Sequence, residues 1–354
     1  MKGELTMKEW TREAVTISEL RINGRIASDE GGYHLYWPLS GAKFQYSGQD
    51  LLVQITSETQ VFPIYMAILV DRKPVIRFPL LKGSYWYPVL QSMDGSLHEI
   101  EIVRETQPIE NNGECDCYLT HFRGNGSFRA MKPAPLRIEF IGDSITCGEG
   151  IVGACGNQEW NTLYLSPSSA YPQLLSSALG ADIQTVSMGG WGVYSDWQNN
   201  KDRNIPAIYE RTCAFTQAGN TPYDFSFDPD IVIVNLGTND HTAMQLLSEA
   251  ERYQRMTEIE AETVAFMGMI RKHNPNAFIL WTYGMAGQTL SGVFRYAVIQ
   301  AKREGIDRSG YLRLSECEPE KQGSRNHPGL DNHRKACDRI LGYLKKYGLI
   351  SSEQ

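Results

Sequence analysis

The feature that most constrains the fold is a change of periodicity near residue 130. Over residues 13–104, short segments alternate polar with apolar residues and are separated by turn residues, and no segment keeps a helical apolar stripe. After the Gly- and Pro-rich stretch 124–135, apolar runs of strand length alternate with amphipathic segments of helix length. Because the two patterns require different architectures, we expect two domains, residues 1–130 and residues 131–354.

The first domain is expected to be an all-β sandwich of jelly-roll type, because it consists of many short strands with Gly, Pro and Asp turns. Asn23-Gly24 stands between short apolar alternations and predicts a β-hairpin, since a type I′ turn needs positive φ at both central positions. Composition changes over residues 121–135, where we place the end of this domain. The other expected strands are residues 43–46, 51–56, 64–70, 74–78 and 98–103.

The second domain is expected to be a three-layer α/β domain with a parallel sheet. Strands that are apolar throughout are buried on both faces, and helices between them act as crossover connections. The expected strands are residues 136–141, 183–187, 231–236 and 278–282. The expected helices are residues 169–179, 249–272, 293–304 and 332–346.

Charge, hydropathy and cysteine content exclude several classes of protein. The net charge of −7 and the lack of long basic runs argue against a nucleic-acid partner. No apolar run approaches the roughly 18 residues of a membrane-spanning helix, so we expect no membrane partner. Seven scattered cysteines, an odd number without a CxxC pair, predict free thiols and no metal site. We therefore expect a cytoplasmic protein, with export left open if a leader precedes this sequence.

Polar residues follow three of the predicted parallel strands, at the edge where open sheets bind ligands. Ser144 lies between Gly142 and Gly148, which permit close approach of the backbone. Residues 186–194 form a glycine-rich strand exit, whose N–H groups could face an anion. Asn239 follows a third strand, where its amide could donate to a negative oxygen. Alone, the Ser144 segment is equally typical of a tight turn, the glycine-rich segment also describes any sharp turn, and the Asn239 segment is more typical of an Asx-turn.

A general base is the remaining requirement. His327 precedes Pro328 in a loop before the last predicted helix, and Pro328 biases it away from helical backbone. His241, directly after Asp240, is the second candidate. A single loop histidine is usually just solvated, so His327 is a candidate base only in combination with Ser144 and Asn239.

This ordered set resembles the SGNH (GDSL-type) hydrolases over residues 136–349. The matching blocks are Gly142-Asp143-Ser144-Ile145, Gly192, Gly237-Thr238-Asn239-Asp240 and His327-Pro328. More narrowly, residues 142–148, 192–194 and 281–285 and the preceding sandwich look like carbohydrate esterase family 2. In that family a jelly-roll module precedes the hydrolase domain, and acetyl groups are removed from sugar hydroxyls, often the 6-hydroxyl.

The resemblance implies a role for each matching residue. Ser144 would be the nucleophile and His327 the general base and then acid. The N–H groups of Ser144 and Gly192, with the Asn239 amide, would hold the oxyanion, and Gly190 is the alternative to Gly192. The substrate-binding candidates are Asp143 and Asp240, through hydrogen bonds around the serine turn and Asn239, and Trp281, as a flat face for a sugar ring or as core packing.

One departure from the resemblance concerns the third member of a triad. Relatives usually carry an aspartate two or three residues before the histidine, but this chain has Arg325 and Ser324 there. Because a backbone carbonyl can also accept the second ring N–H and fix the tautomer, we predict a Ser-His dyad. A carboxylate from elsewhere stays open, with three candidates: Glu316, Glu318 and Asp331.

The expected function is therefore that of a carbohydrate acetyl esterase. It would remove O-acetyl groups from plant cell-wall xylo- or manno-oligosaccharides through an acetyl-enzyme, without metal or organic cofactor. The alternatives are a lipase- or thioesterase-like acyl hydrolase of the same superfamily and a non-catalytic carbohydrate-binding protein. Oligomerisation is left open.

Overall fold

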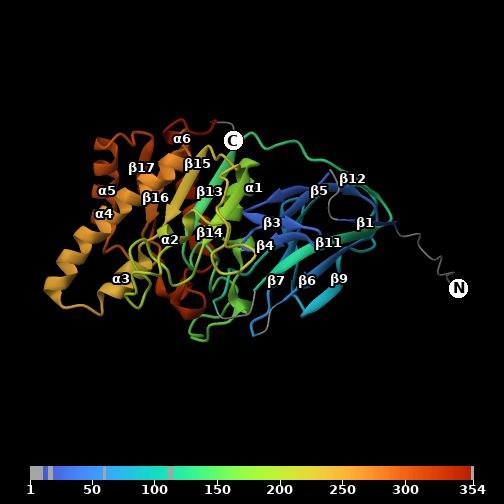
Figure 1. Cartoon of the computed structure of the whole chain (residues 1–354), viewed down its shortest axis with the longest axis horizontal. Coiled ribbons are helices and arrows are strands. Elements are labelled where there is room, and N and C mark those ends of the chain that lie inside the picture. Colours follow the sequence, from blue (N-terminus) through green and yellow to red (C-terminus); the bar gives the residue numbers. More distant parts are fainter. Residues whose placement is uncertain (1–10, 15–18, 59–60, 111–114, 352–354) are drawn as a thin grey trace, which may run out of the picture.

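The computed structural model describes residues 11–14, 19–58, 61–110 and 115–351. Its N-terminal part consists of two antiparallel sheets in a jelly-roll sandwich (Figure 1). One sheet has the order β3-β4-β11-β6-β9 with β1 beside β11, and the other has the order β12-β5-β10-β7-β8 with β2 beside β5. The strands are β1 (Thr11–Ala14), β2 (Arg21–Asn23), β3 (Ile26–Asp29), β4 (Gly32–Leu35), β5 (Gly41–Ser47), β6 (Leu51–Ser57), β7 (Tyr65–Val70), β8 (Lys73–Pro79), β9 (Gly83–Leu90), β10 (Leu97–Arg104), β11 (Cys117–Gly124) and β12 (Ser127–Arg129).

The hairpin expected at Asn23-Gly24 is wrong. β2 pairs with β5 in one sheet, whereas β3 pairs with β4 in the other, so the chain crosses between the sheets at this point. Gly24 has φ +86°, but Asn23 does not have the positive φ that a type I′ turn requires. The Gly24 position instead allows close approach, since a Cβ there would lie 2.8 Å from the Cβ of Ser40.

The composition change over residues 121–135 does not mark the end of the sandwich strands. β11 continues to Gly124, and β12 adds a strand beside β5. Glycine is required at position 126, because a Cβ there would overlap the backbone of Ser47 in the neighbouring strand β5. The connection between the two parts of the chain lies between β12 and β13, after Arg129.

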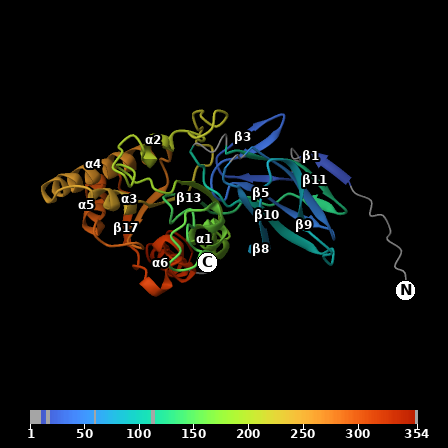
Figure 2. The same cartoon turned by 90° about the horizontal axis from the view of Figure 1, so that it is seen from below.

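The C-terminal part is a five-stranded parallel sheet with the order β14-β13-β15-β16-β17, covered by helices on both faces. Helices α1 and α6 pack together on one face, and α4 and α5 pack together on the other (Figure 2). The strands are β13 (Arg137–Gly142), β14 (Asp182–Ser187), β15 (Ile231–Asn235), β16 (Phe278–Tyr283) and β17 (Ser309–Arg313). The α-helices are α1 (Tyr171–Leu179), α2 (Ile205–Tyr209), α3 (Thr238–Met244), α4 (Glu249–His273), α5 (Ser291–Arg303) and α6 (Leu330–Lys346). Within the described ranges, no helix is long and apolar enough to cross a bilayer.

Buried contacts join the two parts. The fully buried Trp37 donates from Nε1 to the Thr212 carbonyl at 2.7 Å, and it belongs to the apolar core on the α4–α5 side of the sheet. Arg25 pairs with Glu139 of β13 at 3.0 Å, and both side chains are buried. The sandwich therefore shares its core with the parallel sheet. After β10, the Gln107 side chain accepts a hydrogen bond from the Gly189 N–H at 2.9 Å, just past the end of β14.

Candidate active site

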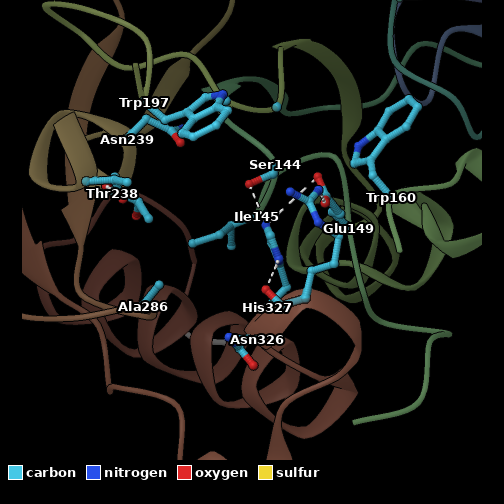
Figure 3. Close-up of a pocket in the computed structure, with 14 residues that line it drawn as sticks. Ser144, Ile145, Glu149, Trp160, Trp197, Thr238, Asn239, Ala286, Asn326 and His327 are labelled. Atoms are coloured by element: carbon cyan, nitrogen blue, oxygen red, sulfur yellow. Dashed lines mark hydrogen bonds and ion pairs between the residues drawn. The ribbon is translucent and has the colours of Figure 1, made fainter. Parts of the chain in front are cut away.

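The serine turn follows β13 directly. The Asp143 carboxylate accepts from the Ile145 N–H at 2.9 Å and thereby shapes the turn that presents Ser144. Glycine is required at position 142, because a Cβ there would overlap the Thr146 side chain. Ser144 lines a cavity of about 410 Å³ at the carboxyl edge of the sheet (Figure 3). A strand exit of this kind is where an open parallel sheet places a ligand site.

His327 meets Ser144 across 183 residues of sequence. Its Nε2 lies 2.8 Å from the Ser144 Oγ, and its Nδ1 lies 2.9 Å from the Arg325 carbonyl oxygen. Because a carbonyl only accepts, Nδ1 carries the proton, and Nε2 is left to accept from the serine hydroxyl. This tautomer is the one that a general base needs. The structure thus places the imidazole of His327 within hydrogen-bond distance of the Ser144 hydroxyl.

The three carboxylates that the sequence left open do not reach the ring. Glu316 is exposed, Glu318 pairs with Lys321 and Lys335, and Asp331 pairs with Arg334. The second histidine candidate, His241, lies outside the cavity, and its Nε2 is 3.0 Å from the Gln245 amide.

The structure corrects the assignment of Gly192 as an oxyanion donor. The Gly192 N–H donates to the Ser195 carbonyl at 2.8 Å, so it has no hydrogen left for a substrate, and Gly192 does not line the cavity. Gly190 does line the cavity, with φ +84°. Among the described residues, none accepts a hydrogen bond from the Gly190 N–H. Gly190, the alternative drawn from the sequence, is therefore the better candidate donor.

Gly192 has another physical reason to be glycine. A Cβ at this position would overlap the Asp240 carboxylate, which packs directly against the loop. That carboxylate accepts three backbone N–H bonds, from Val193 at 3.0 Å, Tyr194 at 2.8 Å and Ser195 at 3.2 Å. Gly192 thus makes room for the residue that holds the glycine-rich loop in place.

Asn239 lies in the first turn of α3, so the helix N-terminus and not an Asx-turn presents its side chain. Its amide Nδ2 donates to the Trp191 carbonyl at 3.0 Å and makes a long 3.5 Å contact with Asp143. Asn239 lines the cavity beside Ser144. One amide hydrogen therefore anchors the side chain, and the other is weakly engaged and can turn to a substrate oxygen.

Two of the expected substrate-binding residues, Asp143 and Asp240, do not contact the cavity. Both side chains are buried and bond to backbone and amide groups behind it. Burial raises the pKa of the Asp143 carboxyl to about 7, and burial also raises the pKa of Asp240. Their hydrogen bonds shape the serine turn and the glycine-rich loop, so they support the site without touching a ligand.

Trp281 is also not a sugar-binding face. It is fully buried in β16 and stacks on Phe294 at 5.3 Å between ring centroids, so core packing accounts for it. The cavity is instead lined by Trp160 and Trp197, the latter 50% exposed (Figure 3). Neither tryptophan was predicted to line the site, because both lie in irregular loops without periodicity. The one signal in the sequence is the position of Trp197, five residues after Gly192.

Comparison with known families assigns this part of the chain. Residues 140–310 match the model of the GDSL-like Lipase/Acylhydrolase family. The match covers slightly less than half of the chain. The matched segment contains Ser144 and Asn239, whereas His327 lies beyond it, in the loop before α6.

Several proteins resemble the chain over most of its length. An acetyl xylan esterase (Est2A) from the rumen bacterium Butyrivibrio proteoclasticus has a solved structure that is 28% identical, with a TM-score of 0.92 over 97% of this chain and 100% of that one. A family two carbohydrate esterase from Clostridium thermocellum, in complex with cellohexaose, is 22% identical with a TM-score of 0.83 over 94% of this chain and 100% of that one, and shares the fold.

Curated sequences resemble it as well. An acetylxylan esterase / glucomannan deacetylase from Cellvibrio japonicus is 23% identical over 92% of this chain and 91% of its own length. The cellulase/esterase CelE of Acetivibrio thermocellus is 24% identical over 91% of this chain, which matches only 39% of CelE.

Proposed function

We propose that this chain is a serine esterase that removes O-acetyl groups from plant cell-wall oligosaccharides. The observation that carries the proposal is the 2.8 Å contact between His327 Nε2 and Ser144 Oγ inside an open cavity. Relatives of matching length are named for acetylxylan and glucomannan deacetylation, which supports the substrate class. The chemistry follows from the residues of the cavity alone.

In the proposed mechanism, His327 takes the Ser144 proton while the hydroxyl oxygen attacks the acetyl carbonyl. The Ser144 and Gly190 N–H groups and the Asn239 amide donate to the resulting oxyanion, replacing the donor set first assigned with Gly192. The imidazolium then protonates the leaving sugar oxygen, and water repeats the cycle on the acetyl-enzyme. The Arg325 carbonyl keeps Nδ1 protonated throughout, as a dyad requires.

The residues that line the cavity favour a sugar over a long acyl chain as the ligand. Trp160 and Trp197 offer flat aromatic faces, and Thr238, Thr242 and Asn326 offer polar groups around the opening. Sugar rings combine apolar faces with a belt of hydroxyls, so a lining of this mixed kind fits them.

The seven free thiols support the expected cytoplasmic location, which cell fractionation would test.

The test is acetate release from acetylated xylo- and manno-oligosaccharides. We expect Ser144→Ala and His327→Ala each to lose at least about 10³-fold in kcat. His241→Ala is the matched control, because this histidine lies outside the cavity, and it should stay near the wild-type rate. Near-full activity of Ser144→Ala would refute the nucleophile assignment, and a strong preference for long acyl esters would refute the substrate class.

A further inference from the structure

A partly buried ion pair between Glu149 and Arg325 flanks the dyad, and no step above uses it. Glu149 is only 3% exposed, and one of its carboxylate oxygens pairs with the Arg325 guanidinium. Its other carboxylate oxygen lies 3.9 Å from His327 Nε2. The Glu149 N–H also donates to the Ser144 carbonyl at 2.9 Å, so Glu149 belongs to the turn that presents the nucleophile.

The partner of Glu149 is the residue that orients the base. Arg325 has φ +54° and Asn326 has φ +57°, so two consecutive non-glycine residues adopt left-handed backbone. Such backbone is unfavourable for residues with a side chain and persists where surrounding contacts hold it. Two contacts hold Arg325: its N–H donates to the Asn157 carbonyl at 2.6 Å, and its side chain binds Glu149. The ion pair thus helps to aim the Arg325 carbonyl at Nδ1 of the imidazole.

The same pair sets the charge around the imidazole. Glu149 is the carboxylate within ion-pair distance of the His327 ring in the described part of the chain. The Arg325 guanidinium pairs with the same carboxylate, and Asp143 shapes the serine turn through its bond from the Ile145 N–H. From α6, His333 also faces the ring; burial lowers its pKa to about 3, so it stays neutral during turnover. Among the described residues, Glu149 is therefore the acidic group within 4.0 Å of the imidazolium that forms in catalysis.

We propose that Glu149 and Arg325 together replace the missing third carboxylate of the triad. Arg325 provides the orientation through its backbone carbonyl, and Glu149 provides the negative charge, from the opposite side of the ring to the carbonyl. Two groups are needed because a backbone carbonyl can fix the tautomer of the imidazole but carries no full negative charge to stabilise the imidazolium. Both are positioning residues, and the proposal rests on the esterase function proposed above.

The test compares Glu149→Gln, Arg325→Met and the double variant by the pH dependence of kcat/KM on acetylated xylo-oligosaccharide. Glu149→Gln removes the negative charge, so the acidic limb should move to lower pH by about 0.5–1 unit, with kcat about 10-fold lower and KM little changed. Arg325→Met leaves the carboxylate uncompensated, so the acidic limb should move to higher pH by a similar amount. The double variant should return toward the wild-type midpoint.

Glu318→Gln is the control, because Glu318 pairs with Lys321 and Lys335 away from the ring, and it should leave the profile unchanged. If a neutral variant fails to fold, Glu149→Asp and Arg325→Lys keep the charges and should lower kcat without moving the acidic limb. Midpoints that stay in place, or that move in the same direction in both neutral variants, would overturn the proposal. A wild type that releases no acetate would instead overturn the esterase function.

Discussion

Gly192 and Asp240 offer a quantitative test of how the glycine-rich loop is held. A methyl group at position 192 would overlap the Asp240 carboxylate, which accepts three backbone N–H bonds at 2.8–3.2 Å. Gly192 does not have positive φ, so alanine is compatible with its backbone and the overlap is the only penalty. We therefore expect the effects of Gly192→Ala and Asp240→Ala to be strongly coupled.

The magnitudes follow from the contacts. Asp240→Ala leaves three N–H groups without an acceptor, two of them buried and that of Tyr194 partly buried, and each orphaned buried donor costs about 1–3 kcal/mol. Burial raises the pKa of Asp240, which means that desolvation of the carboxylate already offsets part of the stabilisation from its hydrogen bonds. We therefore expect the free energy of unfolding to fall by an amount near the low end of this range, about 3 kcal/mol. Gly192→Ala should cost about 1–3 kcal/mol as an overpacked site. In the double variant the methyl has room, so we expect about the loss of Asp240→Ala alone.

Urea unfolding of the four proteins measures the coupling energy, which should be about 1–3 kcal/mol. Acetate release should fall with stability in Gly192→Ala, because the same loop carries Gly190 into the cavity. Gly268→Ala in α4 is the matched control: no atom lies within 4 Å of the added Cβ, so this change should be neutral or slightly stabilising. Additivity of the two losses within about 0.5 kcal/mol would refute the overlap argument.

Three further predictions concern the cavity and its supports. Trp197→Ala should raise KM for acetylated oligosaccharides about 10-fold but leave hydrolysis of 4-nitrophenyl acetate nearly unchanged, as initial rates will show. Gln107→Ala should lower kcat about 10-fold, because Gln107 Oε1 accepts the Gly189 N–H at 2.9 Å, and steady-state kinetics measures the loss. Burial raises the pKa of Asp143 from its ordinary 3.8 to about 7, so the free energy of unfolding of the wild type should fall as pH rises from about 4 to 7. Asp143→Asn removes this titrating group and should weaken that pH dependence, as denaturant titrations at several pH values will show.

Much of the fold follows from the sequence because burial imposes periodicity. The strands that are apolar throughout, such as β15 and β16, and the long amphipathic helices were predicted within a few residues. β17 was missed because it is a short edge strand of mixed composition, with Arg313 at its end. Asn23-Gly24 was misassigned because turn residues specify local geometry but not which strands pair across a sandwich.

The candidate site, like the fold, was predicted only in part. Ser144, Asn239 and His327 were found because they follow strands or precede a helix in a recognisable order, and the structure brings all three to one cavity. Gly192 was assigned the wrong contact, because the sequence does not reveal that its N–H donates to a neighbouring carbonyl. Glu149 stood next to the nucleophile block without any pattern of its own, since its importance comes only from its distance to His327.

The contacts between the sandwich and the parallel sheet bear on whether residues 131–354 form an independent domain. The Glu139 carboxylate is buried in β13 and pairs with Arg25 of the sandwich, and Trp37 fills a fully buried position in the core beside α2 and α4. Removing one partner of a buried ion pair costs about 3–5 kcal/mol, which is a large part of the stability of a typical domain.

We therefore predict that Arg25→Met lowers the unfolding free energy by about that amount in urea titrations, and that a fragment beginning at residue 131 shows no cooperative unfolding. Arg123→Met is the control, because Arg123 packs over the Trp86 ring within the sandwich, at 5.1 Å from its centroid, and its loss should cost about 1 kcal/mol or less. A fragment that unfolds cooperatively and releases acetate would show instead that the shared core is dispensable. The sandwich would then be an accessory to the hydrolase rather than part of its structure.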